Sequence, residues 1–315
     1  MLMEIDFTQF NSLISLVNYF STDAICKAAL IKIRWSSGVI ICPYCHRPHC
    51  VTRTDGRFRC QHCRRNFSCL VGTIFENTKI SLRKWFMAIY LISTHKKGIS
   101  SCQLSRDLQV CQKTAWYMLQ KIRHLFVQDT VLALQGQVEV DEMYVARQTR
   151  FQHFSAQPSA PSIPILGFSE KHTQSNGKGS NIHTTHVRAH VLASPTRTDV
   201  MPLILQNVAR GSHIVTDESH LYHPLSNLRY RHTIVCHAQK QFASYGYTSN
   251  DIELFWHHFR MMLRGIYQKV SDRYIQRYLD EAVYRWNTRK QPQSQRLQQL
   301  LFATSVKYTY RSVRT

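Results

Sequence analysis

Two pairs of cysteines constrain the fold of this chain more than any other feature. The pairs are C-P-Y-C at residues 42–45 and C-Q-H-C at residues 60–63, and 14 residues separate them. Four thiolates on two such turns can close a tetrahedral Zn²⁺ site, and closing it folds a segment too short to build its own core. We therefore predict a zinc ribbon over residues 36–76. The predicted zinc ligands are Cys42, Cys45, Cys60 and Cys63.

Other readings of the cysteine-rich segment stay open. His46, His49 and Cys50 are alternative ligands with less regular spacing, and buried or redox-active cysteine pairs are the alternative to zinc.

The chain has ten cysteines in 315 residues, no run of 18 apolar residues, and no signal-peptide pattern in MLMEIDFTQF. We therefore expect a protein that stays inside the cell, where thiols are reduced.

The net charge indicates a polyanionic partner. The sequence has 40 Lys+Arg against 19 Asp+Glu, a formal charge of +21. Neutralising phosphates releases counterions and steers encounter, so nucleic acid is the leading partner and an anionic membrane the second. Between residues 31 and 65 there are eight Lys/Arg and one acid, Asp55, so we expect the ribbon to face DNA.

Hydrophobic periodicity divides the chain into five regions. Helical spacing predicts short N-terminal helices over 1–35 and a helical region over 77–130, and the residues at 293–315 read as a C-terminal tail. Between them, residues 131–292 alternate strands with helices, which predicts an α/β domain with a mixed sheet flanked by helices. The expected strands lie at 138–145, 164–168, 186–193 and 213–216, the expected helix at 198–207, and the expected loops at 147–162 and 171–181.

Residues 98–123, GISSCQLSRDLQVCQKTAWYMLQKIR, predict a helix-turn-helix. A short helix over Ser101 to Leu108 is followed by Gln-Val-Cys and a second helix. A plain helical hairpin is the alternative, but residues 77–127 carry nine Lys/Arg against one acid, which favours DNA binding. Cys111 occupies the capping position, where Ser or Thr would cap better. The expected contacts to phosphates and base edges are Gln112, Lys113, Tyr117, Gln120 and Lys121.

Three acids stand out in this basic chain. Asp141 lies in VEVDEMYV (138–145), Asp217 ends the apolar run HIVT, and Glu253 lies in the amphipathic segment NDIELFW. We expect both aspartates at strand ends, where a side chain can leave the core. Clustered acids repel DNA unless cations intervene, and carboxylates are the ligands that hard divalent ions prefer. Singly, each acid could be a turn, capping or solvated residue; Glu139, Glu142 and Glu218 are possible substitutes.

Taken together, these motifs resemble one family over about residues 7–290. The chain resembles bacterial insertion-sequence DDE transposases with an N-terminal zinc ribbon, a group related to the Merlin elements. The segments that carry the resemblance are RWSSG-x-x-x-CPYC (34–45), RCQHCRRNFS (59–68), TAWYMLQKIR (114–123), VEVDE (138–142), TDESHLY (216–222), N-x-x-E-x-F-W (250–256), and GIYQKVS with RYLDEAVYRWNTR (265–289).

The resemblance implies an RNase-H-like core in which Asp141, Asp217 and Glu253 are catalytic acids that bind Mg²⁺ or Mn²⁺. Arg260 stands where the group usually has Lys, which keeps the charge but changes its geometry. His237 matches a histidine of the group that contacts DNA or the active site, with a core histidine as the alternative, and Asn250 matches a residue that caps the helix or positions the site; both are predicted DNA-binding residues.

The leading hypothesis is a transposase of the bacterial cytoplasm and nucleoid, which binds terminal inverted repeats, cleaves DNA and transfers strands as a homo-oligomer on DNA. The alternatives are a catalytically inactive DNA-binding regulator and a nuclease without strand transfer. The glycines and lysines that commonly follow the first aspartate are replaced here by ARQTRFQHF at 146–154, which keeps the first alternative open.

Overall fold

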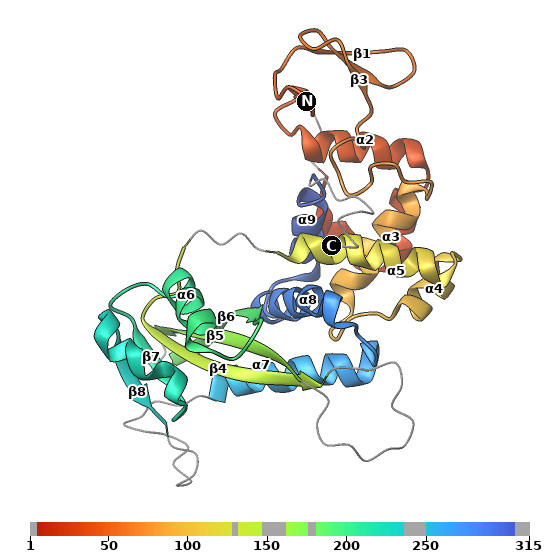
Figure 1. Ribbon diagram of the computed structural model, residues 1–315. Coiled ribbons are helices and arrows are strands. Elements are labelled where there is room, and N and C mark those ends of the chain that lie inside the picture. Colours follow the sequence, from red (N-terminus) through yellow and green to blue (C-terminus); the bar gives the residue numbers. More distant parts are fainter. Residues whose placement is uncertain (1–4, 128–131, 147–161, 176–180, 236–249, 306–315) are drawn as a thin grey trace. The chain divides into compact units, whose positions relative to one another are not determined.

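The computed structural model describes residues 5–127, 132–146, 162–175, 181–235 and 250–305 (Figure 1). The chain forms two compact units. Unit 1 combines Met1–Phe126 with Lys290–Thr315, and unit 2 is Val127–Arg289. Of the predicted features, His237 and nearly all of the loop at 147–162 lie outside the described residues.

Unit 1 is helical and carries a small sheet. Its helices begin at polar caps: the Ser12 side chain accepts from the Ser15 amide, and Thr22, Ser81 and Ser100 cap the next three helices in the same way. Residues expected as part of a C-terminal tail form α9, which packs on α3. The helices are η1 (Phe7–Gln9), α1 (Leu13–Tyr19), α2 (Asp23–Arg34), α3 (Leu82–Thr94), α4 (Ser101–Leu108), α5 (Gln112–Arg123), η2 (His124–Phe126) and α9 (Gln293–Phe302).

The small sheet of unit 1 is the zinc ribbon. Strands β1 (Cys50–Thr52), β2 (Phe58–Cys60) and β3 (Asn66–Phe67) pair antiparallel in that order. Its apolar interior consists of few rings: Phe58 packs edge-on against Trp35 with centroids 5.3 Å apart and lies 5.6 Å from Phe67. So small a core needs a further constraint to stay folded.

Unit 2 is built on a five-stranded mixed sheet in the order β6-β5-β4-β7-β8. The first three strands are antiparallel and the last three are parallel. This sheet, flanked by helices, confirms the predicted RNase-H-like α/β class. The strands are β4 (Gln137–Ala146), β5 (Ser162–Ser175), β6 (Asn181–Val191), β7 (His213–Thr216) and β8 (Arg231–Ile234). The residues expected as a loop at 171–181 thus include the end of β5 and the start of β6.

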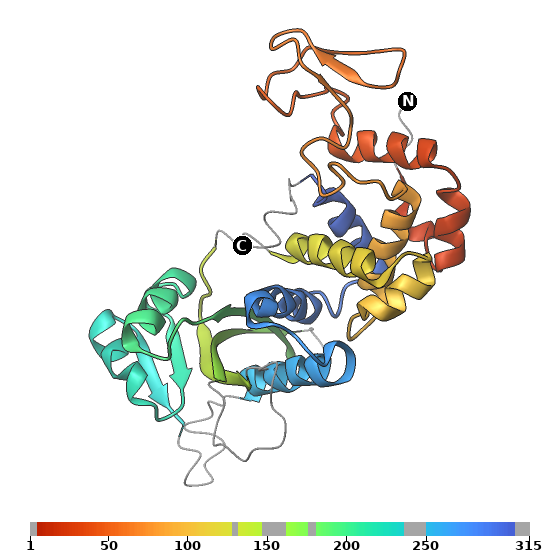
Figure 2. The same cartoon turned by 45° about the vertical axis from the view of Figure 1, so that its right-hand side comes forward.

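Alternation along β4 assigns the two faces of the sheet. Val138 and Val140 pack with α6 (Arg197–Asn207) and η3 (His220–Leu228). Met143 faces the opposite way, toward α7 (Asn250–Met262) and α8 (Ile275–Asn287). Figure 2 shows these last two helices beside the strands. A π-helical segment, η5 (Leu263–Tyr267), and η6 (Asp272–Tyr274) connect them.

Side chains of α8 satisfy the backbone of the edge strand β6. The Asn287 side chain accepts from the Val187 amide (2.8 Å) and donates to the Val187 carbonyl (2.9 Å). Gln276 accepts from the Val191 amide at 2.8 Å. Because these amide groups replace a neighbouring strand, this stretch of the edge is not an open template for strand pairing.

Candidate metal centres and DNA-binding residues

The four predicted zinc ligands form a compact cluster. Their Sγ atoms all lie within 4.8 Å of one another, with Cys42 and Cys63 3.6 Å apart and Cys45 and Cys60 3.6 Å apart. A tetrahedron of thiolates around Zn²⁺ has edges of about 3.8 Å. The cluster therefore fits a structural zinc ion. His46, His49 and Cys50 are not part of this group of four.

Both cysteine pairs adopt the same turn, which explains why the sulfurs converge. The Cys42 amide donates to the Arg47 carbonyl and the Cys60 amide to the Arg65 carbonyl, each at 3.0 Å. The residue after each second cysteine, His46 or Arg64, is left-handed, with φ 56° and 60°. Each turn also directs one backbone N–H at its first cysteine's sulfur, which stabilises a thiolate.

The carboxylates meet because of the register between two parallel strands. Val138 lies opposite Ile214 and Glu139 opposite Val215, so continuing the register would pair Asp141 with Asp217. Oxygens of Asp141, Glu142 and Asp217 lie within 4.8 Å of one another. Asp217 follows the last residue of β7, as predicted.

The prediction that Asp141 ends its strand is wrong. Strand β4 continues to Ala146, paired with β5 throughout. The Asp141 side chain emerges because the neighbouring strand β7 stops at Thr216, and no described strand pairs with this part of β4 on that side.

Helix α7 supplies the remaining side of the site. Glu253 and Arg260 lie on one helical face and, with Asp141 and Asp217, line a pocket of about 640 Å³. The three predicted acids and Arg260 thus line one pocket, but Glu253 is not part of the close group of carboxylate oxygens, which Asp141, Glu142 and Asp217 form. Sequence reasoning missed His257, which lines the same pocket. The signal was present, since His257 lies four residues after Glu253 and therefore on the same face. The other lining residues are Asn250 and Leu254.

Electrostatics in this pocket favour a cation. Burial, together with the negative charges of Asp217 and Glu253, raises the pKa of Asp141 to about 6, although hydrogen bonds from the Glu142 amide and the Trp256 indole oppose the shift. Burial likewise raises the pKa of Glu142 to about 7, although the neighbouring Tyr222 hydroxyl opposes the shift. A divalent cation among these oxygens would reverse the repulsion. The carboxylate oxygens of this pocket are ligands that fit Mg²⁺ or Mn²⁺.

Gly167 allows α7 to approach β4 closely. It pairs with Asp141 across the strands, and a Cβ atom added there would lie 2.4 Å from the Trp256 ring. In this position Trp256 Nε1 donates to Asp141 Oδ2 at 3.0 Å. The absent side chain thus lets the indole lie over the sheet and orient the catalytic candidate.

Replacing Gly167 with Ala is expected to displace the Trp256 ring and α7 with it. Overpacking of this kind costs about 1–3 kcal/mol in unfolding free energy, measurable by urea denaturation. Metal-dependent DNA cleavage should fall by more than the loss of stability accounts for, because Glu253 moves with the helix. Gly265, whose added Cβ would meet no atom within 4 Å, is the matched control. Equal effects of the two substitutions would contradict this account.

The helices predicted as a helix-turn-helix are present, but their outward face is smaller than predicted. Gln112 and Lys113 are exposed and Tyr117 is partly exposed. Gln120 and Lys121, predicted to contact DNA, are buried. The Lys121 ammonium donates to the Ile74 carbonyl and lies 5.8 Å from the centre of the Trp85 ring. The prediction was wrong because it assumed that the charge of Lys121 keeps this side chain at the surface. The buried ammonium is instead satisfied by the Ile74 carbonyl, which is distant in sequence.

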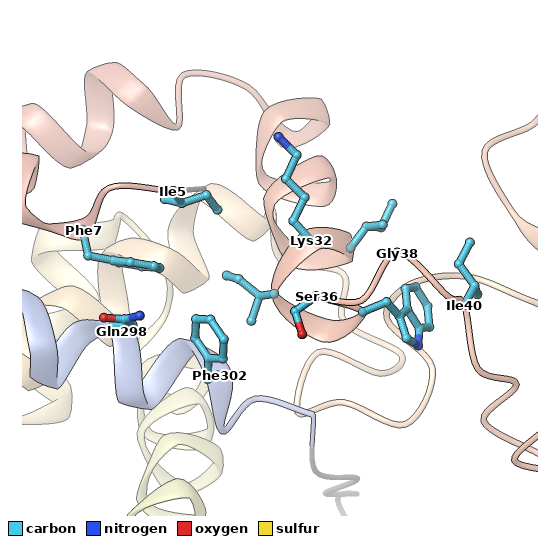
Figure 3. A pocket seen from close by; sticks show the side chains of 11 residues that line it. Ile5, Phe7, Lys32, Ser36, Gly38, Ile40, Gln298 and Phe302 are labelled. Atoms are coloured by element: carbon cyan, nitrogen blue, oxygen red, sulfur yellow. The ribbon is translucent and has the colours of Figure 1, made fainter. Parts of the chain in front are cut away.

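A second pocket, of about 520 Å³, lies in unit 1 (Figure 3). Ile5 and Phe7 line it with α2 and with Phe302 of α9, and Lys32 is the single charged residue of its described lining. Its described lining residues include no carboxylate or thiol, the groups that form the two metal centres.

The fold and the two clusters define an RNase-H-like protein with an N-terminal zinc ribbon. Two family models match the chain: an ISXO2-like transposase domain over residues 133–287 and a transposase zinc-ribbon domain over residues 21–66. The chain belongs to the insertion-sequence DDE transposases with an N-terminal zinc ribbon.

One relative comes from a mobile element. A protein in transposable element ISH50 of Halobacterium salinarum is 36% identical over 121 residues, which are 37% of this chain and 40% of that protein. The match therefore spans less than half of the relative. No solved structure matches the chain. Within the described residues, no helix is long and apolar enough to cross a membrane.

Proposed function

We propose that this protein binds the terminal inverted repeats of its insertion sequence and catalyses metal-dependent cleavage and strand transfer of DNA. The observation that carries the proposal is the convergence of Asp141 and Asp217, from adjacent parallel strands, on the pocket that Glu253 of α7 also lines. Such a cluster of acids in a chain of charge +21 is unfavourable beside DNA unless cations are bound.

Asp141, Asp217 and Glu253 would hold the catalytic Mg²⁺ or Mn²⁺, and Glu142 lies close enough to supply another oxygen. Bound divalent cations would supply activation of the nucleophile and stabilisation of the leaving oxygen. The chain's own groups then orient the DNA. The Arg260 guanidinium contacts a phosphate at the pocket, and Asn250, which also lines the pocket, positions the DNA strand. The DNA contact predicted for His237 lies outside the described residues.

Recognition of the element ends falls to unit 1. The basic ribbon and the exposed residues Gln112, Lys113 and Tyr117 contact phosphates and base edges. Two element ends must be brought together, so the active form is a homo-oligomer on DNA.

The test uses the full-length protein with zinc bound, oligonucleotides carrying the element's inverted repeats, and target DNA. We expect cleavage at the repeat end and joining to target, both dependent on Mg²⁺ or Mn²⁺. Tight repeat binding without cleavage would instead identify an inactive regulator, and cleavage without joining a nuclease. Either result contradicts the proposal.

A further inference from the structure

Glu139 is a buried carboxylate whose presence needs a physical explanation. Its side chain is 0% exposed on the face of β4 that packs against α7. Oε2 accepts a hydrogen bond from the Ile252 amide at 3.0 Å, whereas Oε1 has no hydrogen-bond partner among the described residues. Burying a carboxylate with one oxygen unsatisfied is unfavourable.

The hydrogen bond between Glu139 and the Ile252 amide falls on the first turn of α7. Ile252 is the third residue of that helix, and its amide is among those without a partner inside the helix. Glu139 therefore caps the helix from another element, 113 residues away in sequence. A carboxylate also suits the positive end of the helix dipole.

A second bond joins the same strand to the same helix. Trp256 Nε1 donates to Asp141 Oδ2 at 3.0 Å. Glu139 and Asp141 are separated by about 6.7 Å along one face of the strand, and Ile252 and Trp256 by about 6 Å along the helix. The two bonds therefore match in spacing and hold α7 in one register along β4.

This register decides whether Glu253 reaches the pocket. Glu253 is the residue directly after Ile252, and a slip of one residue would turn the helix by about 100°. Such a slip would carry the Glu253 carboxylate away from Asp141 and Asp217. The bond from the Ile252 amide to Glu139 fixes the helix at the residue adjacent to Glu253. The bond from Trp256 to Asp141 fixes it almost one turn further along.

We propose that Glu139 is a positioning residue that sets the register of α7, so that Glu253 completes the carboxylate pocket. The inference rests on the proposed function, and it replaces the sequence reading of Glu139 as a substitute metal ligand. Glu139 is not among the residues that line the pocket. It touches neither DNA nor cations and acts through Glu253.

The experiment compares three variants of the full-length protein. Glu139→Met removes the acceptor but keeps the volume, Glu139→Gln keeps an oxygen that can accept from the Ile252 amide, and Asn287→Ala weakens unit 2 at the β6 edge, remote in sequence from the pocket acids. The readouts are the melting temperature, the Mn²⁺ concentration for half-maximal cleavage, and hydrogen exchange of the Ile252 amide.

We expect Glu139→Met to melt near the wild-type temperature, because removing a buried carboxylate offsets the loss of its bond to the Ile252 amide. The variant should nevertheless need at least about tenfold more Mn²⁺, the equivalent of one charge-assisted hydrogen bond. Its Ile252 amide should exchange faster. Glu139→Gln should show the wild-type Mn²⁺ requirement and the wild-type exchange rate of the Ile252 amide. Asn287→Ala should lower the melting temperature without changing the Mn²⁺ requirement.

Two results would overturn the inference. One is a Glu139→Met variant with wild-type Mn²⁺ requirement and exchange; the other is a requirement that rises equally in Asn287→Ala. A wild-type protein that neither cleaves DNA nor responds to Mn²⁺ would instead remove the proposed function. The exchange comparison would still decide the role of Glu139, because it does not depend on activity.

Discussion

The Asp141→Asn variant should lose Mg²⁺-dependent cleavage by at least about a thousandfold, since removing a cation ligand forfeits several kcal/mol of transition-state stabilisation. The fold should survive. Asn keeps an oxygen that can accept from Trp256 Nε1, which now donates to Asp141 Oδ2 at 3.0 Å. Single-turnover cleavage of repeat-end oligonucleotides measures the effect.

The same variant should change stability in the opposite direction. Burial and like charges raise the pKa of Asp141 to about 6, above its ordinary value, so the ionised carboxylate opposes folding at pH 7. Asn removes that charge, and the metal-free variant should melt at or above the wild-type temperature. Mn²⁺ should raise the melting temperature of the wild type but not of the variant.

Asp280 offers a matched control on α8. Burial also raises its pKa to about 6, and it accepts a hydrogen bond from Gln276 at 2.8 Å, but it does not line the pocket. Asp280→Asn therefore makes the same chemical change and should leave cleavage intact. Full cleavage by Asp141→Asn, or equal loss in both variants, would contradict the assignment of Asp141.

Removal of zinc should unfold the ribbon while unit 2 stays folded. Structural zinc contributes about 10–16 kcal/mol of apparent binding free energy at pH 7, far more than the few aromatic rings of this segment can replace. Cys60→Ser should release the ion and abolish specific binding to the inverted repeat. Zinc content by atomic absorption and the near-ultraviolet dichroism of the ribbon aromatics report the change.

Cys102→Ser is the control for this experiment, because Cys102 is an exposed cysteine on α4 outside the four-sulfur cluster. It should retain zinc and repeat binding. A Cys60→Ser protein that keeps both would show that the cluster is not the structural centre. Thermal unfolding of unit 2, followed after chelation, should be unchanged.

Local sequence patterns were sufficient for much of this fold. The paired cysteines predicted the ribbon because zinc ligation depends on short turns whose geometry is set within a few residues. Alternating apolar residues predicted four of the five strands of the large sheet. The fifth, Arg231–Ile234, is polar and largely accessible, so it lacks the apolar pattern of the others.

The sequence by itself determined the ligand types, the helices and strands that carry them, and the RNase-H-like class, because these follow from side-chain chemistry and periodicity along the chain. Only the tertiary structure decided where Asp141 becomes accessible, which amide donates to Glu139 and that Lys121 is buried. Each of these depends on a partner far away in sequence: the end of β7, the first turn of α7 and the Ile74 carbonyl. No local pattern encodes such a partner, because packing between distant elements selects it.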